Sequence, residues 1–213
     1  MNDKIKKVLT NLEKNNMQGI YVEKISDVVP KIKELISPGE TVAVGGSMSL
    51  FESGVIDLLR SGEYNFLDRY ADGLSSDDIR DIYIKSFSAD TYFLSSNAIT
   101  ENGELYNVDG NSNRVAALVF GPKSVIVVAG VNKIVKDIDA AITRVKTIAA
   151  PKNCARLNCG TYCKAAGKCV AAEAGDFSGC PSDSRICCSY VVSSYQRVKN
   201  RIKVILVGEE LGY

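Results

Sequence analysis

The sequence contains no histidine, no long hydrophobic run and almost no net charge. Without histidine, the chain of 213 residues cannot build a Ser-His-Asp or Cys-His relay, a His-ligated zinc site or an imidazole general base. Any catalysis must therefore use carboxylates, Lys, Tyr, Cys or a cofactor. Apolar runs such as residues 125–131 are far shorter than the about 20 residues that cross a bilayer, which argues against a membrane protein.

The charge balance argues against polyanionic partners. Lys and Arg number 26 against 25 for Asp and Glu, so the net charge of +1 gives no general field for nucleic acid or anionic lipid. Residues 1–17 are charged throughout and lack the apolar core of a signal peptide. We therefore expect a cytoplasmic protein that binds neither nucleic acid nor a membrane.

Helix and strand patterns alternate over the first 150 residues. Apolar residues at i, i+3, i+4 and i+7 predict a helix from about Asp3 to Asn15. Short apolar runs predict strands at residues 19–23, 41–44, 64–67, 91–94, 104–108, 125–129 and 202–207. This alternation predicts an α/β fold with a largely parallel sheet covered on both faces, and ligands at the carboxyl ends of its strands. We expect a single domain, residues 1–213, with a cysteine-rich insertion at 151–195.

A glycine turn links one predicted strand to the next helix. Gly45, Gly46 and Ser47 could present backbone N–H groups and a helix N-terminus to an anion, although a plain tight turn explains them equally well. Ser49 with Glu52, and Ser75 with Asp78, have the spacing of capping boxes.

A denser polar stretch covers residues 95–114. Asn102-Gly103 between strand-like runs is a hairpin signal that needs no functional explanation. The surrounding carboxylates, amides and arginine could nevertheless orient a small carboxylate ligand, with a lysine that follows the strand at 125–129. The ligand-binding candidates are Gly45, Gly46, Ser47, Asn97, Asn102, Asp109, Asn113, Arg114 and Lys133.

All seven cysteines lie between residues 154 and 188, in a segment that lacks apolar periodicity. The intervals contain four, three, five, ten, six and no residues, so the C-x-x-C spacing of zinc ribbons and ferredoxins is absent. Four thiolates could still hold zinc or an iron-sulfur cluster and thereby order a segment without a core. Inert buried thiols and a catalytic dithiol are the alternatives. Our candidate metal ligands are Cys159, Cys163, Cys169 and Cys187.

Several motifs together resemble the LUD, or lactate utilisation, domain family. They are VGGSMSLFESGV, SSNAITENGELYNVDGNSNRVAA, FGPKSVIVVAGVNKIVKDIDAAITRVK and the cysteine-bearing tail that ends in RICC. The resemblance implies a three-layer α/β/α domain like that of ribose-5-phosphate isomerases and CoA transferases. It also implies a link to the oxidation of lactate to pyruvate, in which related proteins work with iron-sulfur partners. In the family the cysteines follow a Gly-Lys-Cys more compactly than here, where residues 170–179 separate Cys169 from Cys180.

Three functions follow from these expectations. The first is binding of a small organic acid or related anion by a protein that also carries a cysteine-held metal or iron-sulfur centre. Its expected partners are an iron-sulfur redox protein and further copies of the same chain in a homo-oligomer. The second is an acyl-CoA or sugar-phosphate enzyme with Glu101 as the catalytic nucleophile, because family I CoA transferases carry a glutamate in a setting similar to Glu101-Asn102-Gly103. The third is a non-catalytic ligand sensor.

Overall fold

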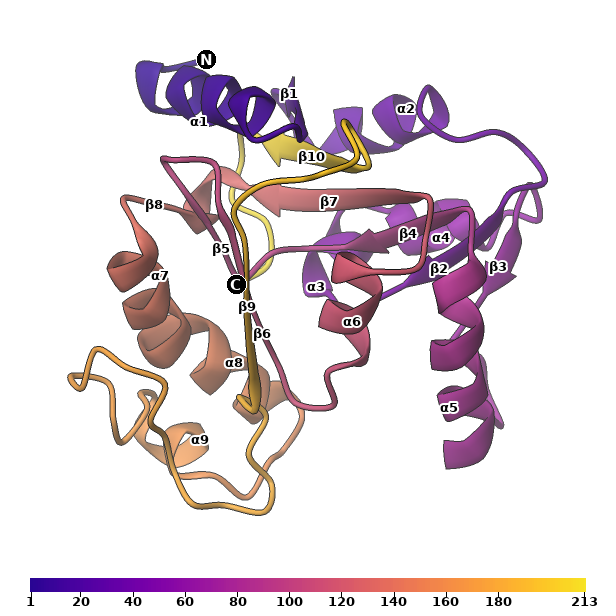
Figure 1. The fold of residues 1–213 in the computed structure, drawn as a ribbon. Coiled ribbons are helices and arrows are strands. Elements are labelled where there is room, and N and C mark those ends of the chain that lie inside the picture. Colours follow the sequence, from indigo (N-terminus) through magenta and orange to yellow (C-terminus); the bar gives the residue numbers. More distant parts are fainter.

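The computed structural model describes residues 1–213 and contains two sheets (Figure 1). The larger sheet has six strands, and every neighbouring pair in it is parallel. In spatial order they are β1 (Gln18–Val22), β10 (Ile202–Val207), β7 (Ser124–Gly130), β4 (Thr91–Leu94), β2 (Thr41–Val44) and β3 (Asn65–Leu67). This arrangement confirms the predicted α/β fold, and all carboxyl ends of these strands meet at one edge.

Both faces of the large sheet are buried, which explains the nearly continuous apolar strand sequences. Along β7, Val125, Val127 and Ala129 face one core, whereas Ile126 and Val128 face the other. The second core is covered by α2 (Val28–Lys33), α3 (Met48–Glu52) and α4 (Val55–Leu59). The first core is covered by α1 (Asp3–Lys14), by α6 (Asn113–Val119) and by the second sheet.

The second sheet was only partly predicted. It contains β8 (Ile134–Val135), β5 (Ala98–Thr100), β6 (Leu105–Asp109) and β9 (Ser189–Ser193), in that spatial order. The Asn102-Gly103 hairpin between β5 and β6 is confirmed. Gly103 has φ +81°, and a Cβ there would lie 2.7 Å from the backbone of Asn11 in α1, so glycine is required by both conformation and space.

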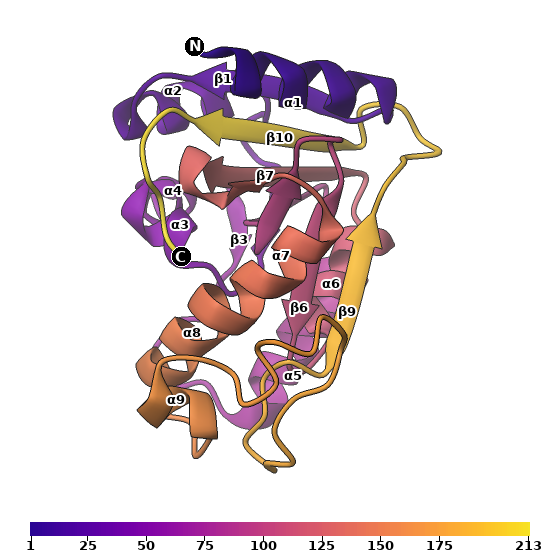
Figure 2. The same ribbon diagram turned by 90° about the vertical axis from the view of Figure 1, so that its left-hand side faces the viewer.

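One long helical segment runs along the outer face of the second sheet (Figure 2). It consists of α7 (Ile138–Arg144), a π-helical turn (Val145–Ala149) and α8 (Ala150–Arg156). The cysteine-rich segment, expected from residue 151, thus begins inside this helical run and not after it. Proline lacks the N–H that an α-helix needs at this point, and the wider π turn immediately before it changes the hydrogen-bond register, so that the helix continues.

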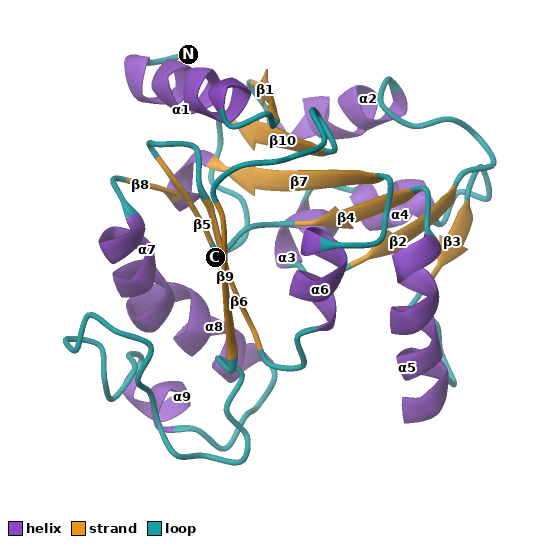
Figure 3. Cartoon of the chain, in the orientation of Figure 1, coloured by secondary structure: helices purple, strands orange, loops and turns teal.

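The cysteine-rich segment has little regular structure. After α9 (Tyr162–Ala166), Figure 3 shows an extended loop that ends in β9. Because β9 pairs with β6, the segment rejoins the second sheet before the chain enters β10. The remaining regular elements are α5 (Ser76–Lys85) and short 3-10 turns at Ile25–Asp27, Ser86–Ser88 and Val131–Lys133. None of the helices combines the length and apolarity required to span a bilayer.

One of the two predicted capping boxes forms. Ser75 and Asp78 cap α5 reciprocally, as expected. The box at Ser49 and Glu52 was wrong, because α3 begins at Met48 and Ser47 precedes it as the N-cap. Ser49 lies inside the helix, where its fully buried hydroxyl contacts other groups instead.

Candidate functional site

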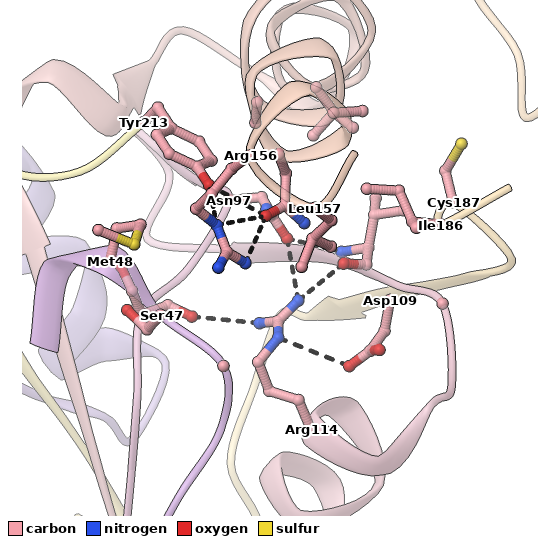
Figure 4. Close-up of a pocket in the computed structure, with 18 of the residues that line it drawn as sticks. Ser47, Met48, Asn97, Asp109, Arg114, Arg156, Leu157, Ile186, Cys187 and Tyr213 are labelled. Atoms are coloured by element: carbon pink, nitrogen blue, oxygen red, sulfur yellow. Dashed lines mark hydrogen bonds and ion pairs between the residues drawn. The ribbon is translucent and has the colours of Figure 1, made fainter. Parts of the chain in front are cut away.

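A cavity of about 260 Å³ opens at the carboxyl ends of three parallel strands (Figure 4). We call it the main cavity. The loops that follow β2, β4 and β7 contribute Ser47, Asn97 and Lys133 to its lining. The end of β6, helix α8 and the loop at residues 185–187 form the remaining walls. The cavity therefore lies where the strand pattern predicts ligands to gather.

Most of the predicted ligand-binding residues meet at this cavity. Those that line it are Gly46, Ser47, Asn97, Asp109, Asn113, Arg114 and Lys133. Gly45 lies directly behind the wall, where a Cβ would come within 2.5 Å of Arg114 Cγ. A glycine at this position therefore lets the arginine side chain pass.

Arg114 organises the cavity wall. One terminal nitrogen donates to Asn107 Oδ1 at 2.6 Å and to the Ser95 carbonyl at 3.2 Å. The other donates to the Val108 carbonyl at 2.7 Å and to Asn97 Oδ1 at 3.1 Å. Its Nε lies 3.5 Å from the Asp109 carboxylate. Since all three nitrogens already have partners, Arg114 mainly fixes the loop after β4 against the end of β6, and burial lowers the pKa of its guanidinium.

Lys133 is buried at the same cavity, with 3% of its surface exposed. Its Nζ donates to Ser49 Oγ at 2.8 Å and to Ser95 Oγ at 2.9 Å. Burial, together with the positive charges of Arg144 and Arg114, lowers the pKa of this amine to about 7, while Glu52 acts in the opposite direction. At neutral pH Lys133 is therefore close to its midpoint of protonation.

Two polar atoms in the cavity wall have no protein partner. Ser47 Oγ and Arg69 Nε are both buried, and neither forms a hydrogen bond. Arg69 stacks over the rings of Tyr83 and Tyr70, with its guanidinium carbon 4.7 and 5.3 Å from their centroids. Buried polar groups without partners are costly, so this part of the wall is suited to adding a polar ligand.

Several residues of the cavity were not predicted from the sequence. Arg156 donates to Tyr213 Oη at 2.8 Å and to Asn153 Oδ1 at 2.9 Å, which places these three side chains along one wall (Figure 4). In total, five cationic side chains line the cavity against one acidic side chain, Asp109. The cationic residues are Arg69, Arg114, Lys133, Arg156 and Arg185. Arg69 follows β3, so the strand-end rule could have found it, whereas no local pattern marks Arg156 or Arg185.

Glu101 and Asn102 are not brought to this cavity. They lie at the tip of the β5–β6 hairpin, where the Glu101 carboxylate accepts a hydrogen bond from Lys7 Nζ of α1 at 2.9 Å. This hydrogen bond lowers the pKa of Glu101. The Asn102 carbonyl accepts from the side chain of Asn15, the C-cap residue of α1, at 2.9 Å. Both residues fix the hairpin to α1, whereas Asn97 precedes β5 at the opposite end of the strand.

A second, much smaller cavity lies next to the main cavity, and four of the seven cysteines line it. We call it the thiol cavity. Its cysteines are Cys163, Cys169, Cys180 and Cys187, and its volume of about 10 Å³ is close to that of a single water site. Cys187, Val145 and Ala150 line both cavities, so the two share part of a wall.

The thiols are largely buried, which disfavours their charged form. Burial raises the pKa of Cys187, against the opposing effect of Arg185, and the nearby Cys169 and Cys180 raise it further. Burial likewise raises the pKa of Cys154 to about 12, outside the thiol cavity. Cys188 is exposed and Cys159 half-buried.

The thiol cavity has the donor chemistry of a metal site without its geometry. Three of the predicted ligands line it, but Cys159 does not, and Cys180 is present instead. Thiolates suit zinc and iron, and the small volume is nearer to a single ion than to a four-iron cluster. However, no three His, Cys, Asp or Glu side chains are arranged so that they could hold a metal ion. The cysteines would have to approach one another to coordinate one.

Comparisons with known proteins agree with this architecture. The family model described as the LUD domain matches residues 5–207. A crystal structure of a DUF162 family protein from Deinococcus radiodurans superposes with a TM-score of 0.55 at 14% sequence identity, covering 96% of both chains. At this identity the likeness shows the fold alone. No curated protein matches the sequence.

Proposed function

Because the chain belongs to the LUD, or lactate utilisation, domain family, we propose that it binds a small organic acid of the lactate and pyruvate type in the main cavity. The observation that carries this proposal is the excess of cationic side chains around a cavity whose wall contains two unpartnered polar atoms. A carboxylate would be attracted by the cations, and its oxygens would accept hydrogen bonds that the protein leaves unmade.

The cavity residues fall into two groups: some use their hydrogen bonds within the cavity wall, and others have hydrogen-bond donors without a partner in the protein. Arg114 and Asn97 are used in the wall itself. Arg69 makes only stacking contacts, and the hydrogen bonds of Arg156 leave one terminal nitrogen without a partner. Arg69 and Arg156 are therefore the groups we assign to the ligand carboxylate, with Ser47 beside them.

Calorimetric titration tests this assignment. We expect lactate or pyruvate to bind, and the neutral analogue lactamide to bind at least about tenfold more weakly, which corresponds to about 1.4 kcal/mol. Arg69→Gln should weaken binding of the acid, whereas Arg80→Gln, an exposed site on α5, is the matched control. Equal binding of acid and amide, or an Arg69→Gln variant that binds like the control, would contradict the proposal.

We further propose that the thiol cavity takes up a thiophilic metal centre, for which a single zinc ion fits the volume better than an iron-sulfur cluster. The supporting observation is the gathering of four thiols around one small space, and the proposal requires these thiols to move closer together when the ion binds. Bound there, the centre would order the segment around it.

Metal analysis of protein purified without oxygen tests this second proposal. We expect about one zinc per chain and no visible absorbance, with the zinc lost in Cys180→Ser and kept in Cys188→Ser, the exposed neighbour of Cys187. If the protein instead contains iron and absorbs visible light through charge transfer, the bound centre is an iron-sulfur cluster and not zinc. Absence of both metals would leave the thiols as inert packing groups.

A further inference from the structure

Lys133 differs from an ordinary buried lysine in its hydrogen-bond partners. Both partners are neutral hydroxyls, Ser49 Oγ and Ser95 Oγ, and all three residues line the main cavity. A buried ammonium normally has a carboxylate partner, because burial of an unpaired charge is costly. The site therefore stabilises the neutral amine more than the charged form.

Lys146 provides an internal comparison. It is nearly as buried, with 5% of its surface exposed, but it lines the thiol cavity. Its Nζ donates to the Ala171 carbonyl at 2.8 Å and lies 3.4 Å from the Asp176 carboxylate. Lys146 is thus paired with a carboxylate, whereas the hydrogen-bond partners of Lys133 are both neutral hydroxyls. Of these two buried lysines, only Lys133 has the surroundings of a nucleophile.

We propose that Lys133 forms an imine with the carbonyl carbon of a 2-oxo acid held in the main cavity. This inference rests on the proposed function, since Arg69 and Arg156 must hold the acid's carboxylate. The amine is also free to react at neutral pH, because burial beside Arg144 and Arg114 lowers the pKa of Lys133 to about 7 against the opposing charge of Glu52.

The reaction requires no oxidant or reductant. The lone pair of Nζ attacks the carbonyl carbon, and the π electrons move to the oxygen as the C–N bond forms. A hydroxyl of Ser49 or Ser95 takes a proton from nitrogen and one is returned to the oxygen, which gives a carbinolamine. The carbinolamine then loses water: the C–O bond breaks as the nitrogen lone pair forms the C=N bond, the leaving hydroxyl takes up a proton, and the nitrogen gives up its remaining one, which leaves the imine. The balance is amine plus carbonyl to imine plus water.

Reductive trapping tests the inference directly. We expect pyruvate with cyanoborohydride to leave one secondary-amine adduct per chain, located at Lys133 by peptide mass spectrometry. Lactate, which has no carbonyl group to react, should leave none. Trapping should increase as the pH rises from about 6 to about 8, because the neutral amine is the reacting form. The reaction should be lost in Lys133→Arg and kept in Lys146→Arg.

The outcomes separate this inference from the function on which it rests. If calorimetry detects pyruvate binding but the wild-type protein gives no adduct at Lys133, the imine is excluded and the binding function stands. If neither pyruvate nor lactate binds, the proposed function itself fails. Adducts spread evenly over surface lysines would also exclude a nucleophilic Lys133, and this mapping on the wild-type protein does not depend on any variant folding.

Discussion

The main cavity and the thiol cavity are neighbours with opposite chemistry. The main cavity is lined by charged and amide side chains that loops bring from three strand ends, and Arg114 ties the loop after β4 to the end of β6 through hydrogen bonds. The thiol cavity is lined mostly by thiol and apolar side chains, from the cysteine-rich segment and from the helical residues before it, with Lys146 as its one charged residue. Hydrogen bonds hold the polar wall of the main cavity, whereas van der Waals packing holds the wall of the thiol cavity. Substitutions in the two walls should therefore lower the free energy of unfolding by different amounts.

The largest effect is expected at Arg114. Arg114→Met keeps much of the side-chain volume but leaves the buried oxygens of Ser95, Asn107 and Val108 without their donor. We expect the free energy of unfolding to fall by about 3–5 kcal/mol, as when one partner of a buried polar network is removed. Urea denaturation measures this change, and the exposed Arg80→Met is the control. A loss below about 1 kcal/mol would mean that the hydrogen bonds do not hold the polar wall.

A pH-dependent effect is expected at Lys133. Its lowered pKa of about 7 means that, from about pH 7 to about pH 10, the unfolded chain still binds a proton that the folded protein has released. The free energy of unfolding should therefore rise with pH in this range, by at most about 1.4 kcal/mol per pH unit. Lys133→Met removes this contribution, and denaturation at several pH values compares the slopes. If the free energy of unfolding changes with pH equally in the wild type and in Lys133→Met, the pKa of Lys133 is not lowered by folding.

Smaller changes are expected in the thiol cavity. Cys180→Ser places a more polar hydroxyl among apolar walls and should cost about 1–2 kcal/mol in reduced, chelator-treated protein. Cys188→Ser, at an exposed position, should stay within about 0.5 kcal/mol of the wild type. If both variants lose the same free energy of unfolding, the thiols that line the cavity contribute no more to stability than the exposed thiol.

The smallest effect is expected at Glu101. Glu101→Gln weakens a surface contact with Lys7 and changes nothing in either cavity, so pyruvate affinity and the melting temperature should remain near their wild-type values. Calorimetry and a thermal melt measure both quantities. A large loss of affinity or of turnover would instead support a nucleophilic role for this carboxylate.

The large sheet could be predicted from the sequence because its strands are buried on both faces. Such strands appear as short apolar runs, and the predicted ranges at 41–44, 91–94 and 202–207 coincide with β2, β4 and β10. The second sheet was harder to predict. β8 has two residues, and β9 pairs with β6 about 80 residues away in sequence, so neither has a strong local pattern.

The candidate site was predicted in part for a similar reason. Ser47, Asn97 and Lys133 follow buried strands, and the rule that ligands gather at strand ends brings them together. Glu101 was grouped with them because it is close in sequence, but the hairpin carries it to α1. Arg156 and Arg185 reach the cavity from α8 and the cysteine-rich segment, through tertiary packing that a local sequence pattern does not record.

The wall shared by Cys187, Val145 and Ala150 connects the energetics of the two cavities. Val145 begins the π turn and Ala150 begins α8, so a shift of this helix would change the shape of both spaces at once. By thermodynamic reciprocity, any factor by which an acid on one side alters metal affinity on the other must equal the factor by which the metal alters acid affinity.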